Sequence, residues 1–239
     1  APRATPWLSV ASMLGLLALA IGAVAHGGVE VTFAGDWGLR PFGDGVWVSG
    51  VALVLDGLSR LFLLLVAVVG TASAIYALRY LAPEPGRPLF HVLFNLLVAG
   101  MNGALLAGDL FTLYVFVEVA SIASYGLVAY RTGGTEVEAA FKYLVLGTLA
   151  STGILLGITV LYAATGFLNL ADLAAAIAAG AVPPVALAFA SGLFVLGFAT
   201  KTAAMPFHAW LPDAHPSAPA PISAMLSGLL IKTLGIYAL

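Results

Sequence analysis

The sequence has no cysteine and very little charge. The missing thiol groups exclude disulfide bonds, zinc sites with thiolate ligands and iron–sulfur clusters. Only 8% of the 239 residues are Asp, Glu, Lys or Arg, whereas 62% are hydrophobic. A soluble domain carries about a quarter charged residues, and a surface this poor in charge would not keep a protein monomeric in water. The composition therefore predicts a polytopic membrane protein that contacts the lipid bilayer.

Further absences exclude other functional classes. The net charge is −2 and there is no basic block, so we expect no nucleic-acid partner. The four histidines, at positions 26, 91, 208 and 215, lack the close pairing of zinc or haem ligands. No glycine-rich dinucleotide motif is present. We therefore expect no cofactor, no metal and no catalytic redox site in this chain.

Long apolar runs take the place of charge. A helix that spans a bilayer needs about 20 mostly apolar residues. Six or seven windows qualify: 7–26, 56–80, 88–108, 110–130, 138–163, 184–204 and 219–239. The number is six if the first window is a signal peptide instead of a membrane helix. Between them, we expect the Gly-rich loop 27–55 to be an extended or hairpin segment at the outer interface, and residues 169–180 to form a short interfacial helix.

Loop charges predict the orientation. Arg3, Arg79, Arg87 and Arg131 fall on one side if every window spans, and Arg40 alone lies clearly on the other. Cytoplasmic loops carry an excess of Lys and Arg. We therefore expect the start of the chain to face the cytoplasm of a prokaryotic cell, with the protein in its cytoplasmic membrane. The chain starts without Met and ends inside an apolar run, which predicts a fragment.

Glu118 lies deep inside an apolar window. A charged residue at the centre of a membrane helix costs about 2.5–3.5 kcal/mol, so such residues mark ion pathways or pair with one another. Glu118 follows Asp109 by nine residues, which places it about 13 Å along its helix, near mid-membrane. Tyr114, Ser121 and Tyr125 share its face. We expect an ion-pathway role; the alternative is a carboxylate that only joins helices through hydrogen bonds.

Lys201 stands just before a proline-broken segment. Pro206 lacks a backbone donor and clashes with the carbonyl of residue 202, so the helix should break or kink after Lys201. Freed carbonyls are tolerated in a bilayer only against protein or a wet cavity. We expect residues 205–215 to form a short second half of a broken helix, and residues 216–221 a turn. Such a break suits proton transfer; the alternative is a lysine that snorkels to the interface.

Lys232 lies in the last apolar window, 13 residues beyond Pro219. This spacing places it roughly 20 Å along its helix. An isolated buried lysine loses solvation and gives up its proton more readily, as a relay requires. The alternative is a structural lysine that is paired with a carbonyl.

Three other titratable residues are weaker candidates for the ion pathway. Lys142 follows Glu138 by one helical turn, in the order that favours an ion pair, and pairing or snorkelling competes with a functional role there. His208 and His215 lie in the broken segment. They could supply protons or hydrogen-bond the broken backbone, and the sequence leaves both options open.

Three motifs together resemble a known family. They are GDLFTLYVFVEVASIASYGLVAY (108–130), AAFKYLVLGTLAS (139–151) and KTAAMPFHAWLPDAHPSAPAPISAMLSGLLIK (201–232). In this order they are similar to the antiporter-like subunits of respiratory complex I, of membrane-bound hydrogenases and of Mrp-type cation/proton antiporters. The resemblance covers residues 50–239, and its first motif favours the Mrp D-subunit and hydrogenase branch.

The resemblance implies a fold. The family has an all-α membrane bundle of fourteen core helices with two inverted repeats of five, and this chain would supply helices 2–8. Residues 1–54 would be an N-terminal helix and outer loop, and residues 55–239 the antiporter-like domain, truncated at its C-terminus. By position, Glu118 resembles the family's helix 5 glutamate, Lys201 the lysine of the interrupted helix 7, and Lys232 the helix 8 lysine. Lys142 lies where many members have a basic residue.

The resemblance also implies a function: translocation of protons, or exchange of Na⁺ and H⁺, beside partner membrane subunits of an antiporter, a hydrogenase or complex I. Glu118 would keep Lys201 protonated, and separation of the pair would release a proton toward Lys232. In complex I the chain would be an ion-translocating subunit. Two alternatives stay open: a structural, non-conducting subunit, and a stand-alone secondary transporter with a broken-helix site. The sequence chooses neither the ion nor the parent complex.

Overall fold

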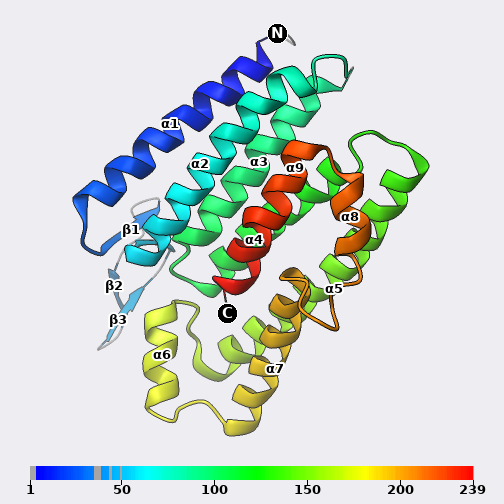
Figure 1. Cartoon of the computed structure of the whole chain (residues 1–239). Helices are drawn as coiled ribbons and strands as arrows, with labels where there is room; N and C mark the ends of the chain where they lie inside the picture. Colours follow the sequence, from blue (N-terminus) through cyan, green and yellow to red (C-terminus); the bar gives the residue numbers. More distant parts are fainter. Residues whose placement is uncertain (1–3, 35–38, 43–44, 49, 85, 239) are drawn as a thin grey trace.

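Long helices dominate the structure. The computed structural model describes residues 4–34, 39–42, 45–48, 50–84 and 86–238. Within these ranges, six helices are long and apolar enough to cross a membrane, and they form the bundle seen in Figure 1. They are α1 (Thr5–His26), α2 (Gly57–Tyr80), α3 (Arg87–Leu106), α4 (Leu110–Val128), α5 (Gly134–Thr165) and α7 (Pro184–Lys201). The prediction of a helical, multi-pass membrane protein is confirmed.

The helices pack largely in chain order. α1 packs on α2, α2 on α3, α3 on α4, α4 on α5, and α5 on α7. The first apolar window joins this bundle as α1: its Ser12 hydroxyl lies 2.8 Å from Asn95 Oδ1 on α3, and the Thr71 hydroxyl on α2 donates to the Met13 carbonyl at 3.2 Å. Polar contacts of this kind hold helices together in a bilayer.

Close contacts between α3 and α4 rely on glycine. A Cβ at Gly100 would lie 2.5 Å from the backbone nitrogen of Ala120. Only a residue without a side chain lets the two helix backbones approach this closely, as is common in membrane bundles. The contact fixes the position of α4, which carries Glu118.

Short strands cover the end of the bundle where α2 begins. β1 (Glu30–Ala34) pairs antiparallel with β4 (Val51–Leu55), and β2 (Leu39–Phe42) pairs with β3 (Gly45–Val48). The buried Arg60 of α2 donates to the carbonyls of Gly27 and Gly28 and lies 3.6 Å from Glu30. The extended segment expected in loop 27–55 is therefore present. We call this end, marked by β1 and β4, the strand end.

A short helix closes the strand end. α6 (Leu170–Ala178) begins after Asn169, whose side-chain oxygen accepts from the backbone N–H of Ala171 at 3.0 Å. The short helix predicted within residues 169–180 is therefore present, and Asn169 is its N-cap. The backbone of Leu110 also donates to Leu168 at 3.0 Å, which ties the start of α4 to this segment.

Arginines gather at the opposite end of the bundle. Arg131 Nε lies 3.3 Å from Glu84 Oε1 and its Nη2 donates to the Tyr80 hydroxyl, while Arg87 donates to the Leu78 carbonyl at 2.9 Å. Arg3, which also entered the orientation argument, lies outside the described residues. We call this end, where α2 stops at Tyr80 and α5 begins, the arginine end.

The helix before the proline-rich segment stops at Lys201. Ala204 donates its backbone N–H to the Ala199 carbonyl at 2.8 Å, and Ala203 donates to Thr200 at 3.1 Å. With Ala203 in the left-handed region at φ 54°, this is the Schellman arrangement that ends helices. The predicted break after Lys201 is confirmed.

The segment after the break differs from the expected bounds. Residues 205–210 form turns, and α8 spans Leu211–Ser217 instead of residues 205–215. Pro212 explains the late start, because its fixed φ suits the first helical turn and it needs no N–H there. The turn is also shorter than residues 216–221, since α8 includes Pro216 and α9 (Ala220–Met225) begins early. Two π-helical turns, Leu226–Leu230 and Lys232–Ile236, follow α9.

Candidate functional site

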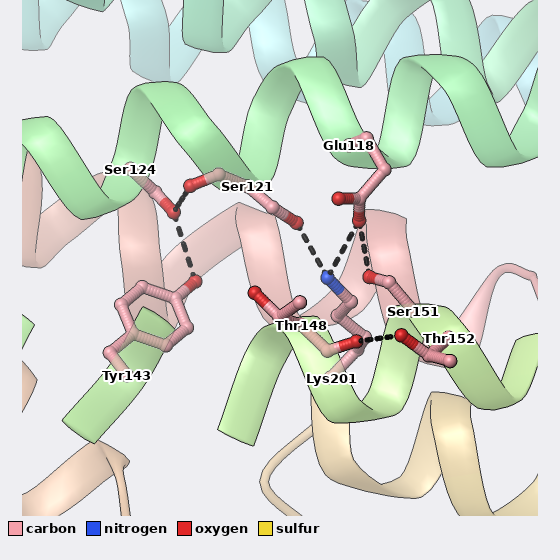
Figure 2. A network of polar contacts seen from close by, with 8 residues as sticks. All are labelled: Glu118, Ser121, Ser124, Tyr143, Thr148, Ser151, Thr152 and Lys201. Atoms are coloured by element: carbon pink, nitrogen blue, oxygen red, sulfur yellow. Dashed lines mark hydrogen bonds and ion pairs between the residues drawn. The ribbon is translucent and has the colours of Figure 1, made fainter. Parts of the chain in front are cut away.

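Glu118 and Lys201 meet inside the bundle. Glu118 projects from α4 and Lys201 from the last residue of α7, and Lys201 Nζ lies 3.4 Å from Glu118 Oε1. The lysine also donates to Ser121 Oγ at 2.7 Å. The side chain of Lys201 is only 4% exposed and that of Glu118 is 24% exposed. Figure 2 shows the ammonium pointing between the glutamate and the serine.

Local sequence explains how this group forms. Ser121 follows Glu118 by three residues, so the two side chains lie on one face of α4, as expected from the sequence. The Schellman cap ends α7 at the lysine and fixes where its side chain starts. An ion pair buried inside a bundle of apolar helices is the arrangement expected for membrane charges that cannot reach water.

Sequence reasoning missed a third helix in this site. The hydroxyl of Ser151 on α5 donates to Glu118 Oε1, as Figure 2 also shows. Glu118 therefore connects α4, α5 and α7. The signal was present in the motif AAFKYLVLGTLAS, where Ser151 is the last residue, but a serine in an apolar helix does not reveal which helix it faces.

The Thr200 carbonyl, at the break, contacts protein. Trp210, at the start of α8, donates its indole N–H to the Thr200 carbonyl at 2.9 Å. Trp210 is therefore a second partner of this carbonyl, which also accepts from the Ala203 backbone N–H at 3.1 Å, and the break faces protein, one of the two environments expected for it. Pro206 itself is exposed and lines a mostly apolar cavity of about 220 Å³ with Thr200 and Phe207.

Lys142 lies apart from the buried pair. Its Nζ is 2.8 Å from Glu138 Oε1 and 2.8 Å from Asp213 Oδ2, and its side chain is 47% exposed. The expected pair with Glu138 is present. Asp213 on α8 was missed, because the contact joins two segments that are far apart in the sequence.

The helical turn that carries Lys232 packs near Lys201, but the Lys232 amine does not contact Lys201. Lys232 Nζ donates to the Ser227 carbonyl, which is the carbonyl pairing weighed as the alternative. The turn Lys232–Ile236 packs on α7, and Gly235 lies against Thr202. Among the described residues, no hydrogen bond or ion pair joins Lys201 to Lys232. π-Helical turns such as these occur frequently at functional sites.

The two histidines of the broken segment occupy different surroundings. His208 is exposed. His215 is half-buried: its Nε2 lies 3.3 Å from the Ser227 hydroxyl, and its carbonyl accepts from Ser223 at 2.6 Å. Ser227 thus contacts both His215 and Lys232, so His215 lies on the Lys232 side of the site.

These features define the class of protein. The chain is a multi-pass membrane protein with an interrupted helix and a buried carboxylate–lysine pair at the interruption. Residues 107–239, more than half of the chain, match the family model described as NADH:quinone oxidoreductase/Mrp antiporter, TM, and the chain belongs to this family. Residues 46–91 match a second model, NADH-Ubiquinone oxidoreductase (complex I), chain 5 N-terminus. The resemblance stated from the motifs is confirmed.

Relatives of different kinds share this chain's sequence and shape. The N subunit of NADH-quinone oxidoreductase from Desulforudis audaxviator is 42% identical over 192 residues, covering 80% of this chain and 38% of that protein. The D subunit of a Na(+)/H(+) antiporter from Alkalihalophilus pseudofirmus is 35% identical over 222 residues, covering 90% and 42%. A chain in the structure of the membrane-bound sulfane sulfur reductase, an archaeal respiratory membrane complex, has a TM-score of 0.86 at 32% identity, covering 99% and 49%. The chain thus spans less than half the length of each.

Proposed function

We propose that this chain translocates protons, or exchanges Na⁺ and H⁺, across a membrane as an antiporter-like subunit of a multisubunit complex. The partners are other membrane subunits of an antiporter, a hydrogenase or complex I. Two relatives, a subunit of a quinone oxidoreductase and a subunit of a Na(+)/H(+) antiporter, support this class. The arginine end faces the cytoplasm of a prokaryotic cell, because cytoplasmic loops are rich in Lys and Arg.

One observation carries the proposal. Lys201 is buried in the bundle, and its ammonium contacts Glu118 at 3.4 Å and Ser121 at 2.7 Å. An opposite charge and a hydrogen-bond acceptor both favour the charged form of a lysine. If a movement separates the pair, the ammonium loses this support in a poorly solvated place and releases its proton. The reversible contact is therefore a proton-binding switch.

The other candidates form the rest of the pathway. Lys232 is the next acceptor, because its helical turn packs on α7. His215 lies beside it through Ser227. Lys142 and His208 are exposed, so they would exchange protons with the surroundings of the bundle. The Lys201 ammonium lies between Glu118 and Ser121 and already contacts the oxygen atoms of both, which favours the proton as the ion moved here.

The test measures transport by the complete complex in sealed vesicles, with a pH-sensitive dye and with or without Na⁺. Glu118→Gln keeps the shape of the side chain and removes its charge, and Lys201→Met removes the amine. We expect each variant to lower proton transport about 100-fold or more, the scale of a lost proton-transfer group. A dependence on Na⁺ in the native complex would identify cation exchange.

A matched control separates function from assembly. Glu136→Gln removes a carboxylate in the first turn of α5, where its partner is the Thr135 hydroxyl. We expect full transport from this variant. If the pair only joins helices, transport by the Glu118 and Lys201 variants will fall in proportion to the amount of assembled complex. If both variants assemble and transport at the native rate, the proposal is wrong.

A further inference from the structure

Trp210 holds the backbone at the base of Lys201 from beyond the break. Its indole N–H donates to the Thr200 carbonyl at 2.9 Å, and the residue is 1% exposed. Thr200 directly precedes Lys201. This bond therefore helps to fix the end of α7 that carries the lysine. Its donor, Trp210, belongs to the segment after the break.

Trp210 is in turn held by α5. The ring of Tyr143 lies parallel to the Trp210 indole, with ring centroids 4.1 Å apart and 7° between the planes. The same ring meets Tyr125 of α4 edge-on, with centroids at 4.5 Å. Tyr143 is 4% exposed. Aromatic contacts in both geometries are favourable, so Tyr143 connects the segment after the break to α4.

The Tyr143 hydroxyl extends this connection to the lysine site. It lies 3.0 Å from Ser124 Oγ, and Ser124 Oγ donates to the Ser121 carbonyl at 2.6 Å (Figure 2). The Ser124 hydroxyl has one proton, which it donates to the Ser121 carbonyl. The Tyr143 hydroxyl is therefore the donor in the 3.0 Å contact with Ser124 Oγ. The side chain of Ser121 is the acceptor for Lys201.

We propose that Tyr143 and Trp210, together named the aromatic bracket, are positioning residues for Lys201; this inference rests on the proposed function above. Their contacts form a closed circuit that holds the lysine by its backbone at one end and by its ammonium at the other. In order, the circuit runs through Lys201, Thr200, Trp210, Tyr143, Ser124 and Ser121.

The bracket matters because the ion pair is the looser of the two lysine contacts. Lys201 lies 3.4 Å from Glu118 but 2.7 Å from Ser121. Inside a membrane protein, Coulomb attraction is weakly screened and depends on distance. A small displacement of the end of α7 therefore changes the attraction to Glu118. The titratable groups around this circuit are Glu118 and Tyr125 from α4, Tyr143 from α5, and Lys232 on the turn packed against α7.

The test removes one hydrogen-bond donor at a time from the bracket in the complete complex. Tyr143→Phe removes only a hydroxyl, whereas Trp210→Phe removes the indole N–H together with part of a buried ring; each variant keeps an aromatic ring in the stack. We expect transport to fall about two- to tenfold in each, the factor for one lost hydrogen bond. We also expect the pH of half-maximal transport to move lower, because a less well-held ammonium releases its proton more readily.

Two controls show whether the effect passes through the circuit. Tyr162→Phe removes an exposed hydroxyl from the same helix near the strand end, and it should leave both the rate and the pH profile unchanged. Ser124→Ala breaks the same hydrogen bond as Tyr143→Phe. Groups in one network are non-additive, so the double variant should be no worse than the more severe single variant.

A purely structural bracket gives different results. It predicts less assembled complex with an unchanged pH profile per complex, or additive effects of Ser124→Ala and Tyr143→Phe, and either result overturns the proposal. Suppose that Glu118→Gln and Lys201→Met lose transport while both bracket variants behave like the native complex. That result rejects the role of the bracket and leaves the proposed function standing. Native transport in the Glu118 and Lys201 variants rejects the proposed function itself.

Discussion

Two lysines of this chain contact carboxylates in opposite surroundings. Lys142, near the arginine end, lies 2.8 Å from each of two carboxylates and is 47% exposed. Lys201, inside the bundle, lies 3.4 Å from one carboxylate and is 4% exposed. By distance alone, Lys142 has the stronger pairing. Because Lys201 is buried, however, we expect its pairing to contribute more to stability than that of Lys142.

The difference lies in what each lysine does without its partner. An exposed ammonium that loses its carboxylate is solvated by water, so exposed pairs contribute little. A buried ammonium has no such substitute, and removing one partner of a buried pair leaves an uncompensated charge. The long contact at Lys201 is therefore the one on which both stability and proton affinity depend.

The largest expected effect comes from breaking the buried pair on one side. Lys201→Met leaves the Glu118 carboxylate without its cation, which costs about 3 kcal/mol, the lower end for a buried pair because Glu118 is partly exposed. The apparent unfolding midpoint of the purified complex should fall accordingly. Lys201→Met combined with Glu118→Gln should recover most of this stability without recovering transport. Equal midpoints for the single and double variants would contradict an ion pair.

An intermediate effect should follow from the packing beneath that pair. Gly197 lies one turn before Lys201, and a Cβ there would meet Ile154 Cγ1 at 2.5 Å and the Ala150 carbonyl at 2.9 Å. Gly197→Ala should destabilise the complex by about 1–3 kcal/mol through overpacking of α5 against α7, and should also lower transport.

Gly192 offers the matched control on the same helix. Nothing lies within 4 Å of a Cβ at this position, so Gly192→Ala should leave stability unchanged or raise it by about 0.5–1 kcal/mol. If both alanine variants have the same unfolding midpoint, close packing of α5 and α7 does not support the buried pair.

The smallest effect is expected at the exposed pair. Lys142→Ala removes both 2.8 Å contacts, yet the unfolding midpoint should change little. The change should shrink further at high salt, because ions screen exposed charges. A large, salt-independent loss of stability would show that Lys142 is desolvated in the complete complex and would remove the contrast with Lys201.

The sequence was sufficient for features set by short-range rules. The apolar windows located the six spanning helices that the structure describes, and the three-residue spacing placed Ser121 beside Glu118. Pro206 predicted a break after Lys201, because proline lacks a backbone donor and clashes with the carbonyl of the residue four positions before it. The family motifs then ordered Glu118 and Lys201 into one site.

Other contacts depend on how distant segments pack, and the sequence could not supply them. Ser151 reaches Glu118 across 33 positions and Asp213 reaches Lys142 across 71. The late start of α8 also escaped prediction, because five prolines within 206–221 allow several helix starts. Hydropathy cannot show which face of an apolar helix meets which neighbour.

The variant Lys201→Arg tests the proposed relay most directly. Arginine keeps the positive charge and can pair with Glu118, but a guanidinium does not release its proton in a protein. Proton transport by the assembled complex in vesicles, normalised to its amount, is the quantity to measure. If Lys201 carries the proton, transport should be lost although the complex assembles and keeps its thermal stability. Native transport from Lys201→Arg would show that the pair holds helices together and does not carry the proton.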